Sequence, residues 1–156
     1  MEFYSVVLLV VTIAAVNSAE VGKSVPESLE KLNKGELRYI ISLLKDGVQT
    51  DVVDSGARDE SFKDLAEKLS KHDDPRYGMI DYEYQENGSP VTKRVLLLWN
   101  PEAATPEAKK IYRDAYNEKQ AAAAGADYFV EFNKKSELTD ESLVAKLKAT
   151  LPIPKA

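Results

Sequence analysis

The sequence predicts an α/β fold: a single domain whose central mixed sheet of five to six strands is flanked by helices on both faces. Three observations carry this prediction. The chain has 156 residues, which fits one domain. Runs rich in β-branched and aromatic residues alternate with segments whose apolar residues recur at helical spacing. The run at residues 95–99 is apolar at every position, which is typical of a strand buried on both faces.

The first predicted elements of the domain are a helix and a hairpin. Apolar residues recur at helical spacing over residues 24–34, which predicts a short amphipathic helix. Residues 37–44 predict a strand, and a turn at residues 45–47 leads into a second strand near residues 50–53.

A second helix and the central hairpin follow. The helix is predicted over residues 59–69, where apolar residues recur at i, i+3, i+4 and i+7 and Asp59 is placed to cap the first turn. Two long strands are predicted at residues 77–84 and 91–99. The Asn-Gly pair at residues 87–88 lies between them and is typical of a type I′ turn, which needs positive φ at both central positions.

The last third of the chain predicts a long helix, a strand and a final helix. Thr105 followed by proline is a helix start, and we expect the helix to run to about Ala124, where Gly125 stops it. A strand is predicted at residues 127–132, and Thr139 is expected to cap the final helix.

The faces of these two helices can also be predicted. The apolar stripe of the long helix is expected to consist of Ala108, Ile111, Tyr112 and Ala115. Its more exposed face is expected to carry Lys109, Arg113 and Tyr116. In the final helix, Lys146 and Lys148 are expected to remain in water.

The amino-terminal residues predict a secretory signal peptide. Residues 6–16 form an apolar run, shorter than the roughly 20 residues that a membrane-spanning helix needs. Small residues at 17–19 suit signal peptidase. We therefore expect residues 1–19 to be removed and residues 20–156 to form a secreted, extracellular domain. A buried amino-terminal strand or helix in a cytoplasmic protein is the alternative.

Composition excludes several functional classes. The absence of cysteine excludes disulfides, thiolate zinc sites and cysteine nucleophiles. The single histidine, His72, lies in a polar run typical of a solvated loop, and no G-x-S-x-G turn accompanies it. Acidic pairs at residues 59–60 and 73–74 are in positions where charges are normally solvated, so we expect no enzyme, no metal and no cofactor. A net charge of −5 argues against electrostatic attraction of the whole protein to nucleic acid or to an anionic membrane, and we expect no nucleic-acid partner and no stable membrane insertion.

One N-x-S sequon is present, at Asn87, and makes this residue a candidate for glycosylation. The hairpin turn is the favoured interpretation, since Pro90 directly after the sequon lowers its occupancy.

Several phrases resemble the actin-depolymerising factor/cofilin family. Residues 37–41, a basic residue followed by Tyr-Ile-Ile, are similar to the family's first-strand phrase, and residues 74–84 to its D-x-R-Y-A-V-Y-D-F-x-Y segment. The sequence Trp-Asn-Pro at residues 99–101 matches its W-x-P. Further matches fall at Tyr112, Gly125 and the pair Leu138-Thr139. The resemblance covers residues 25–150 and implies the actin-depolymerising factor homology fold.

The resemblance also implies a function, which is binding to actin monomers and/or filaments and depolymerisation of filaments without catalysis. Family members insert the long helix, with the amino-terminal segment, into the cleft of an actin monomer. A second basic surface, on a central strand and the last helix, contacts the neighbouring subunit of a filament. The carried-over residues here are Lys93, Lys109, Lys110, Arg113, Lys146 and Lys148. We expect a monomer.

Two departures from the family pattern predict weakened affinity. The R-S-K triplet that begins the family's long helix aligns with residues 107–109, where Glu107 replaces the arginine. A second R-S-K aligns with residues 91–93, where Val91 replaces the first basic residue. Since actin is acidic, a like charge at the interface is unfavourable.

The alternative is a secreted protein of the same fold that no longer binds actin. Pro106 and Glu107 resemble the glia maturation factor branch, which acts on the actin-branching complex, whereas Trp99 and Pro101 resemble cofilin. The family's regulatory serine lies near the amino terminus, which makes Ser24 a candidate phosphorylation site.

Overall fold

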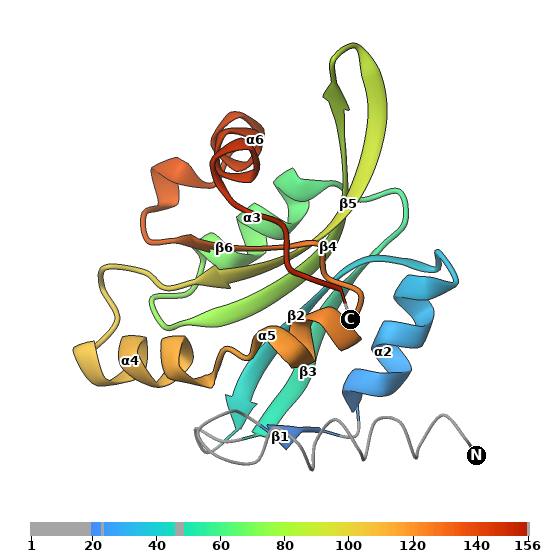
Figure 1. Cartoon of the computed structure of the whole chain (residues 1–156). Coiled ribbons are helices and arrows are strands. Elements are labelled where there is room, and N and C mark those ends of the chain that lie inside the picture. The colour runs from blue at the N-terminus through green and yellow to red at the C-terminus, as the bar shows by residue number, and fades with distance from the viewer. Residues whose placement is uncertain (1–19, 23, 46–48, 156) are drawn as a thin grey trace.

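Figure 1 shows a computed structural model of the chain, in which residues 20–22, 24–45 and 49–155 are described. The predicted signal peptide and most of the predicted turn at residues 45–47 lie outside these ranges. Among the described residues, no helix is both long enough and apolar enough to cross a membrane.

Six strands form one mixed sheet in the order β1-β3-β2-β4-β5-β6, which confirms the predicted fold class. The strands are β1 (Glu20–Val21), β2 (Leu37–Lys45), β3 (Gln49–Ala57), β4 (Arg76–Glu86), β5 (Ser89–Trp99) and β6 (Tyr128–Phe132). The β1–β3 and β5–β6 pairs are parallel, and the three pairs between β3 and β5 are antiparallel. The short β1 had no signal in the sequence.

Helices cover both faces of the sheet (Figure 1). They are α2 (Ser24–Asn33), α3 (Phe62–Ser70), α4 (Pro106–Ala115), α5 (Glu118–Ala123) and α6 (Asp140–Ala149), with a short 3₁₀ turn η1 (Lys135–Glu137) before α6. Helices α3 and α6 pack on one face, called here the α3/α6 face. Helices α2, α4 and α5 pack on the opposite face, called the α2/α4/α5 face.

Strand β5 is buried from both sides, as predicted from its apolar run. Val95, Leu97 and Trp99 belong to the core on the α3/α6 face. Leu96 and Leu98 contribute to the clusters on the opposite face. Because successive side chains of a strand point to opposite faces, a run without polar residues is what a sheet between two helical layers requires.

The β4–β5 turn also confirms the prediction. Glu86 pairs with Ser89, and the two residues between them have φ of 52° at Asn87 and 80° at Gly88. Both are positive, as in a type I′ turn. Asn87 is exposed at the tip of the hairpin, which projects beyond the rest of the sheet (Figure 1).

The cap predicted for α3 was wrong. The N-cap residue is Ser61, not Asp59, and a capping box joins it to Asp64, whose carboxylate accepts a hydrogen bond from the Ser61 N–H at 2.8 Å. Glu60 does not enter the helix, because its carboxylate binds the Ala57 N–H at 2.7 Å and the Tyr39 hydroxyl at 2.8 Å. The tertiary contact with Tyr39 therefore delays the helix start.

The predicted long helix is two helices. Tyr116 leaves the helical conformation, with φ −61° and ψ 131°, and Asn117 then caps α5 by accepting hydrogen bonds from the Lys119 and Gln120 N–H groups. The Tyr116 ring stacks on Phe129 of β6, with ring centroids 3.9 Å apart. Tyr116 is thus half-buried, not part of an exposed face as predicted.

One member of the predicted apolar stripe of this region is also misplaced. Ile111 is 37% exposed, whereas Tyr112 is buried. Helix α4 contacts the sheet along a narrow line through Tyr112, and Ile111 lies about 100° further around the helix.

Candidate functional site

Helix α4 is held against the sheet by Tyr112. The Tyr112 hydroxyl accepts a hydrogen bond from the Leu44 N–H at 3.0 Å, and its carbonyl accepts one from the Tyr77 hydroxyl. The two tyrosine rings lie 5.3 Å apart. Burial raises the pKa of both hydroxyls, so both remain protonated at neutral pH, and that of Tyr77 is the donor. The anchored helix leaves Glu107, Lys110 and Arg113 exposed.

The start of α4 is built locally. Thr105 accepts a hydrogen bond from the Ala108 N–H at 3.2 Å, and Pro106 occupies the first helical position. Glu107 follows in the first turn and is exposed. Its negative charge interacts favourably with the positive amino-terminal end of the helix dipole, which explains why a glutamate is stable here.

The three predicted cations of α4 all interact with oxygens of this chain. Lys109 donates from Nζ to the Glu102 carbonyl at 3.1 Å. Lys110 pairs with Asp114 one turn later, a contact that the i,i+4 spacing makes recognisable in the sequence. Arg113 pairs with Glu131 of β6 through two hydrogen bonds, of 3.0 Å from Nε and 2.7 Å from Nη2.

Sequence reasoning missed Glu131, because eighteen positions separate it from Arg113 and no local pattern joins them. The hydrogen bond from Arg113 lowers the pKa of Glu131 and outweighs burial, which acts in the opposite direction. Asn133 and Lys146 lower the pKa further. The glutamate is therefore ionised at neutral pH.

The other predicted basic residues lie on the α3/α6 face. Lys93 stands opposite Tyr82 in the β4–β5 register, and the Tyr82 hydroxyl donates to Asp140 of α6 at 2.8 Å. Lys146 lies over the Phe132 ring, with Nζ 5.0 Å from the ring centroid, while Lys148 is exposed. The predicted cations thus form two sets on opposite faces of the sheet.

Ser24, the candidate phosphorylation site, begins α2 and is half-buried. Its hydroxyl donates to Asp51 Oδ1 at 3.2 Å and accepts from the Val52 N–H at 3.0 Å. A phosphate on Ser24 would meet the Asp51 carboxylate and break both contacts.

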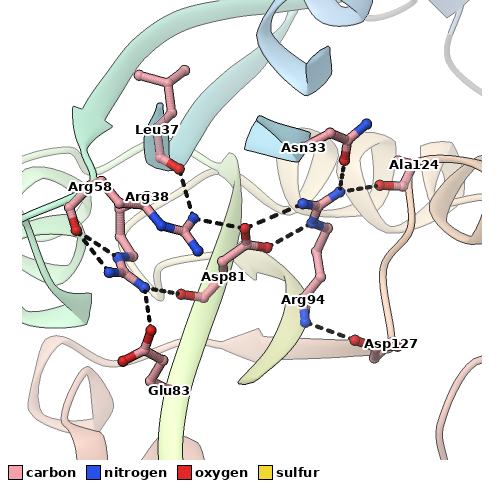
Figure 2. Close-up of polar contacts among 9 residues, drawn as sticks. All are labelled: Asn33, Leu37, Arg38, Arg58, Asp81, Glu83, Arg94, Ala124 and Asp127. Atoms are coloured by element: carbon pink, nitrogen blue, oxygen red, sulfur yellow. Dashed lines mark hydrogen bonds and ion pairs between the residues drawn. The ribbon is translucent and has the colours of Figure 1, made fainter. Parts of the chain in front are cut away.

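A buried polar cluster, drawn in Figure 2, lies on the sheet face covered by α2 and α5. Asp81 of β4 accepts hydrogen bonds from Arg58 at 2.9 Å and from Arg94 at 2.7 and 3.3 Å. Arg94 also donates to Asn33 at 2.6 Å and to the Ala124 carbonyl at 3.1 Å. Because these polar groups satisfy one another, the cluster joins β4 and β5 to α2 and α5, and we assign it a structural role.

No group of three or more histidine, aspartate or glutamate side chains in the described residues is arranged to hold a metal ion.

Comparison with known proteins agrees with the family resemblance. The model of the family described as cofilin/tropomyosin-type actin-binding protein matches residues 18–148, which is most of the chain. A cofilin from Ogataea parapolymorpha is 29% identical over 122 residues, which cover 77% of this chain and 84% of the relative.

Solved structures show the same fold. The crystal structure of Streptomyces griseoflavus cofilin has a TM-score of 0.71 at 21% identity and covers 85% of this chain and 99% of that one. The solution structure of glia maturation factor from Caenorhabditis elegans has a TM-score of 0.67 at 17% identity and covers 84% of this chain and 96% of that one. Because the family model matches residues 18–148, a range that includes both predicted basic sets, the protein belongs to the cofilin/tropomyosin-type actin-binding protein family.

Proposed function

We propose that this protein binds actin in the manner of cofilin, more weakly than a typical cofilin does, and promotes filament depolymerisation without catalysis. The observation that carries the proposal is the surface of α4. It presents Lys109, Lys110 and Arg113 on a helix anchored by Tyr112 in a chain of this family. Cations at fixed positions suit an acidic partner such as actin.

The weaker affinity follows from the carboxylates on the same surface. Glu107 is exposed in the first turn of α4, while Asp114 and Glu131 already pair with Lys110 and Arg113. Actin has to compete with these intramolecular pairs and to accommodate a like charge at Glu107.

The second basic set, Lys93, Lys146 and Lys148, is proposed to contact the neighbouring subunit of a filament. It lies on the opposite face of the sheet from α4, and this separation supports a contact with a second actin subunit.

Co-sedimentation of the purified protein with filamentous actin, together with the polymerisation rate of actin monomers, tests the proposal. We expect partial co-sedimentation that declines with added salt. Glu107→Arg is expected to tighten binding about tenfold, which corresponds to about 1.4 kcal/mol. Glu118→Arg is the matched control, because Glu118 is also an exposed glutamate in the first turn of a helix, α5, but belongs to neither basic set. Absence of binding and of any effect on polymerisation, for both the wild type and Glu107→Arg, would refute actin binding.

A second candidate function is that of a secreted protein of this fold that does not bind actin and acts as a glia-maturation-factor-like or other extracellular effector. The exposed Glu107 and the self-paired cations of α4 favour it. Capture of partners from the extracellular fluid of the source would support this candidate if actin were absent and a specific partner were recovered.

Secretion is proposed on the apolar run at residues 6–16 alone. Amino-terminal sequencing of the native protein is the test. A mature terminus at Ala19 or Glu20 in an extracellular fraction supports a cleaved signal, and a cytoplasmic protein that retains residues 1–19 contradicts it.

A further inference from the structure

The Arg113–Glu131 pair differs in kind from the other ion pairs of α4. Arg113 makes two parallel hydrogen bonds to both carboxylate oxygens of Glu131, a geometry that is stronger and more directional than a single contact. Lys110 and Asp114, in contrast, are both largely exposed neighbours on one helix. Such exposed pairs contribute little to stability.

Glu131 is fixed in place by its surroundings. Its side chain is only 23% exposed, compared with 54% for that of Arg113. Strand β6 pairs Glu131 with Leu98 of β5. The Asn133 amide donates to Glu131 Oε2 at 2.8 Å and also to the Asn100 carbonyl at 2.9 Å, so the carboxylate is tied to the sheet. Arg113 is therefore the partner that is more accessible to another molecule.

The pair uses the edge of the guanidinium that best suits a carboxylate. Nε and Nη2 of Arg113 are both directed at Glu131. An aspartate or glutamate of a binding partner that approached the same edge would have to displace Glu131 from these two donors. The negative charge of Glu131 also offsets the positive charge of Arg113 at close range.

We propose that Glu131 is an internal competitor for Arg113 and thereby sets the affinity of the α4 surface for acidic side chains of its partner. This inference rests on the proposed binding of actin through α4. It identifies a determinant of affinity on β6, outside the helix that makes the contact.

The central test is Glu131→Gln, which keeps the shape of the side chain and its contact with Asn133 but removes the charge. We expect the Kd for actin to fall about fivefold, since one charged hydrogen-bonded pair is released. Asp114→Asn is the matched control, because it also removes one negative charge near α4 but breaks only an exposed pair. We expect its Kd to change by less than about twofold.

A double-variant cycle shows whether Glu131 acts through Arg113. In an Arg113→Ala background, Glu131→Gln should no longer tighten binding beyond the effect of Asp114→Asn. Asn133→Ala removes the amide that holds the Glu131 carboxylate in position for Arg113 and changes no charge, so it should weaken the competition and give a smaller gain in the same direction. Asn133→Ala replaces Glu131→Gln as the test if thermal unfolding shows that Glu131→Gln is too unstable to assay.

The outcomes separate this inference from the proposed function. If wild-type protein binds actin and Glu131→Gln binds equally or less tightly, Glu131 is not a competitor and the inference is wrong, while actin binding stands. A gain that persists in the Arg113→Ala background also overturns the inference. If the wild type and every variant, Glu107→Arg included, fail to bind actin, the proposed function fails and the inference falls with it.

Discussion

The carboxylate of Asp81 accepts a hydrogen bond of 2.7 Å from Nε of Arg94, its direct neighbour across the β4–β5 pair. Arg94 lies on the sheet face covered by α2 and α5, where its guanidinium also reaches Asn33 and the Ala124 carbonyl. A single ion pair thus links the central hairpin to the ends of two helices that are far apart in the sequence.

Replacing Asp81 should destabilise the protein strongly. In Asp81→Ala, the guanidinium groups of Arg94 and Arg58 lose their common acceptor, and leaving a buried charge unpaired costs about 3 kcal/mol. Urea denaturation followed by circular dichroism measures the loss. Glu83→Ala is the control, because the exposed Glu83 carboxylate lies 3.4 Å from Arg38, and we expect a change within about 0.5 kcal/mol. Equal effects of the two substitutions would contradict the structural role of the cluster.

Acid should remove the contribution of Asp81. Burial alone would raise the pKa of this carboxyl, but hydrogen bonds from Arg94 and Arg58 outweigh it and hold the pKa below the ordinary value of 3.8. A pKa that is lower in the folded state means that the stabilisation is present above the unfolded-state pKa and is lost as the pH falls through the folded one.

We therefore expect the unfolding free energy of the wild type to fall as the pH drops below about 4, with Asp81→Asn showing a shallower decline. Urea titrations at a series of pH values measure both slopes. Identical slopes for wild type and Asp81→Asn would mean that other carboxyls, such as Asp127 and Glu131, account for the whole acid response.

The start of α3 provides a third prediction. Ser61→Ala removes the N-cap side chain and should cost about 1 kcal/mol of unfolding free energy. Asp59→Ala, two residues earlier, should leave the stability unchanged, because Asp59 does not cap the helix. Thermal unfolding of the two variants decides between the residues, and the opposite ranking would restore Asp59 as the cap.

The carboxyl-terminal tail should contribute to stability through one side chain. Ile153 is 6% exposed and packs in the core on the α2/α4/α5 face, although it follows α6 on the other face. Its N–H donates to the Asp127 carbonyl at 2.8 Å. We expect Ile153→Ala to cost about 2 kcal/mol. Leu151→Ala should change stability by less than about 0.5 kcal/mol, since Leu151 is 88% exposed. Similar losses for both would show that the tail does not pack as described.

The parts of the fold that were predictable depend on neighbours in the chain. The β4–β5 hairpin follows from two apolar runs and the Asn87-Gly88 turn between them, all of which act within a few residues. The Thr105 and Thr139 caps were correct for the same reason, because each hydroxyl binds an N–H three residues later.

Two of the failures, at Tyr116 and at the start of α3, involve distant partners. Helical propensity continues through Tyr116, yet stacking on Phe129 of another element favours an extended conformation there. Glu60 is diverted from α3 by Tyr39 of β2. The candidate site divides in the same way: the six cations could be named from the resemblance, whereas the partner of Arg113 on β6 could not.

The sequence by itself determined the α/β class, most of the strands and helices, the cofilin-type family and the basic residues of its surfaces. Tertiary structure alone decided where the long helix breaks and which residue starts α3. It also decided how Asp81 and Arg94 join four elements, and that Arg113 pairs with Glu131. The physical reason is range. Periodicity, caps and turns act within one or two turns of chain, whereas buried ion pairs and ring stacking depend on residues that meet only once the sheet has assembled.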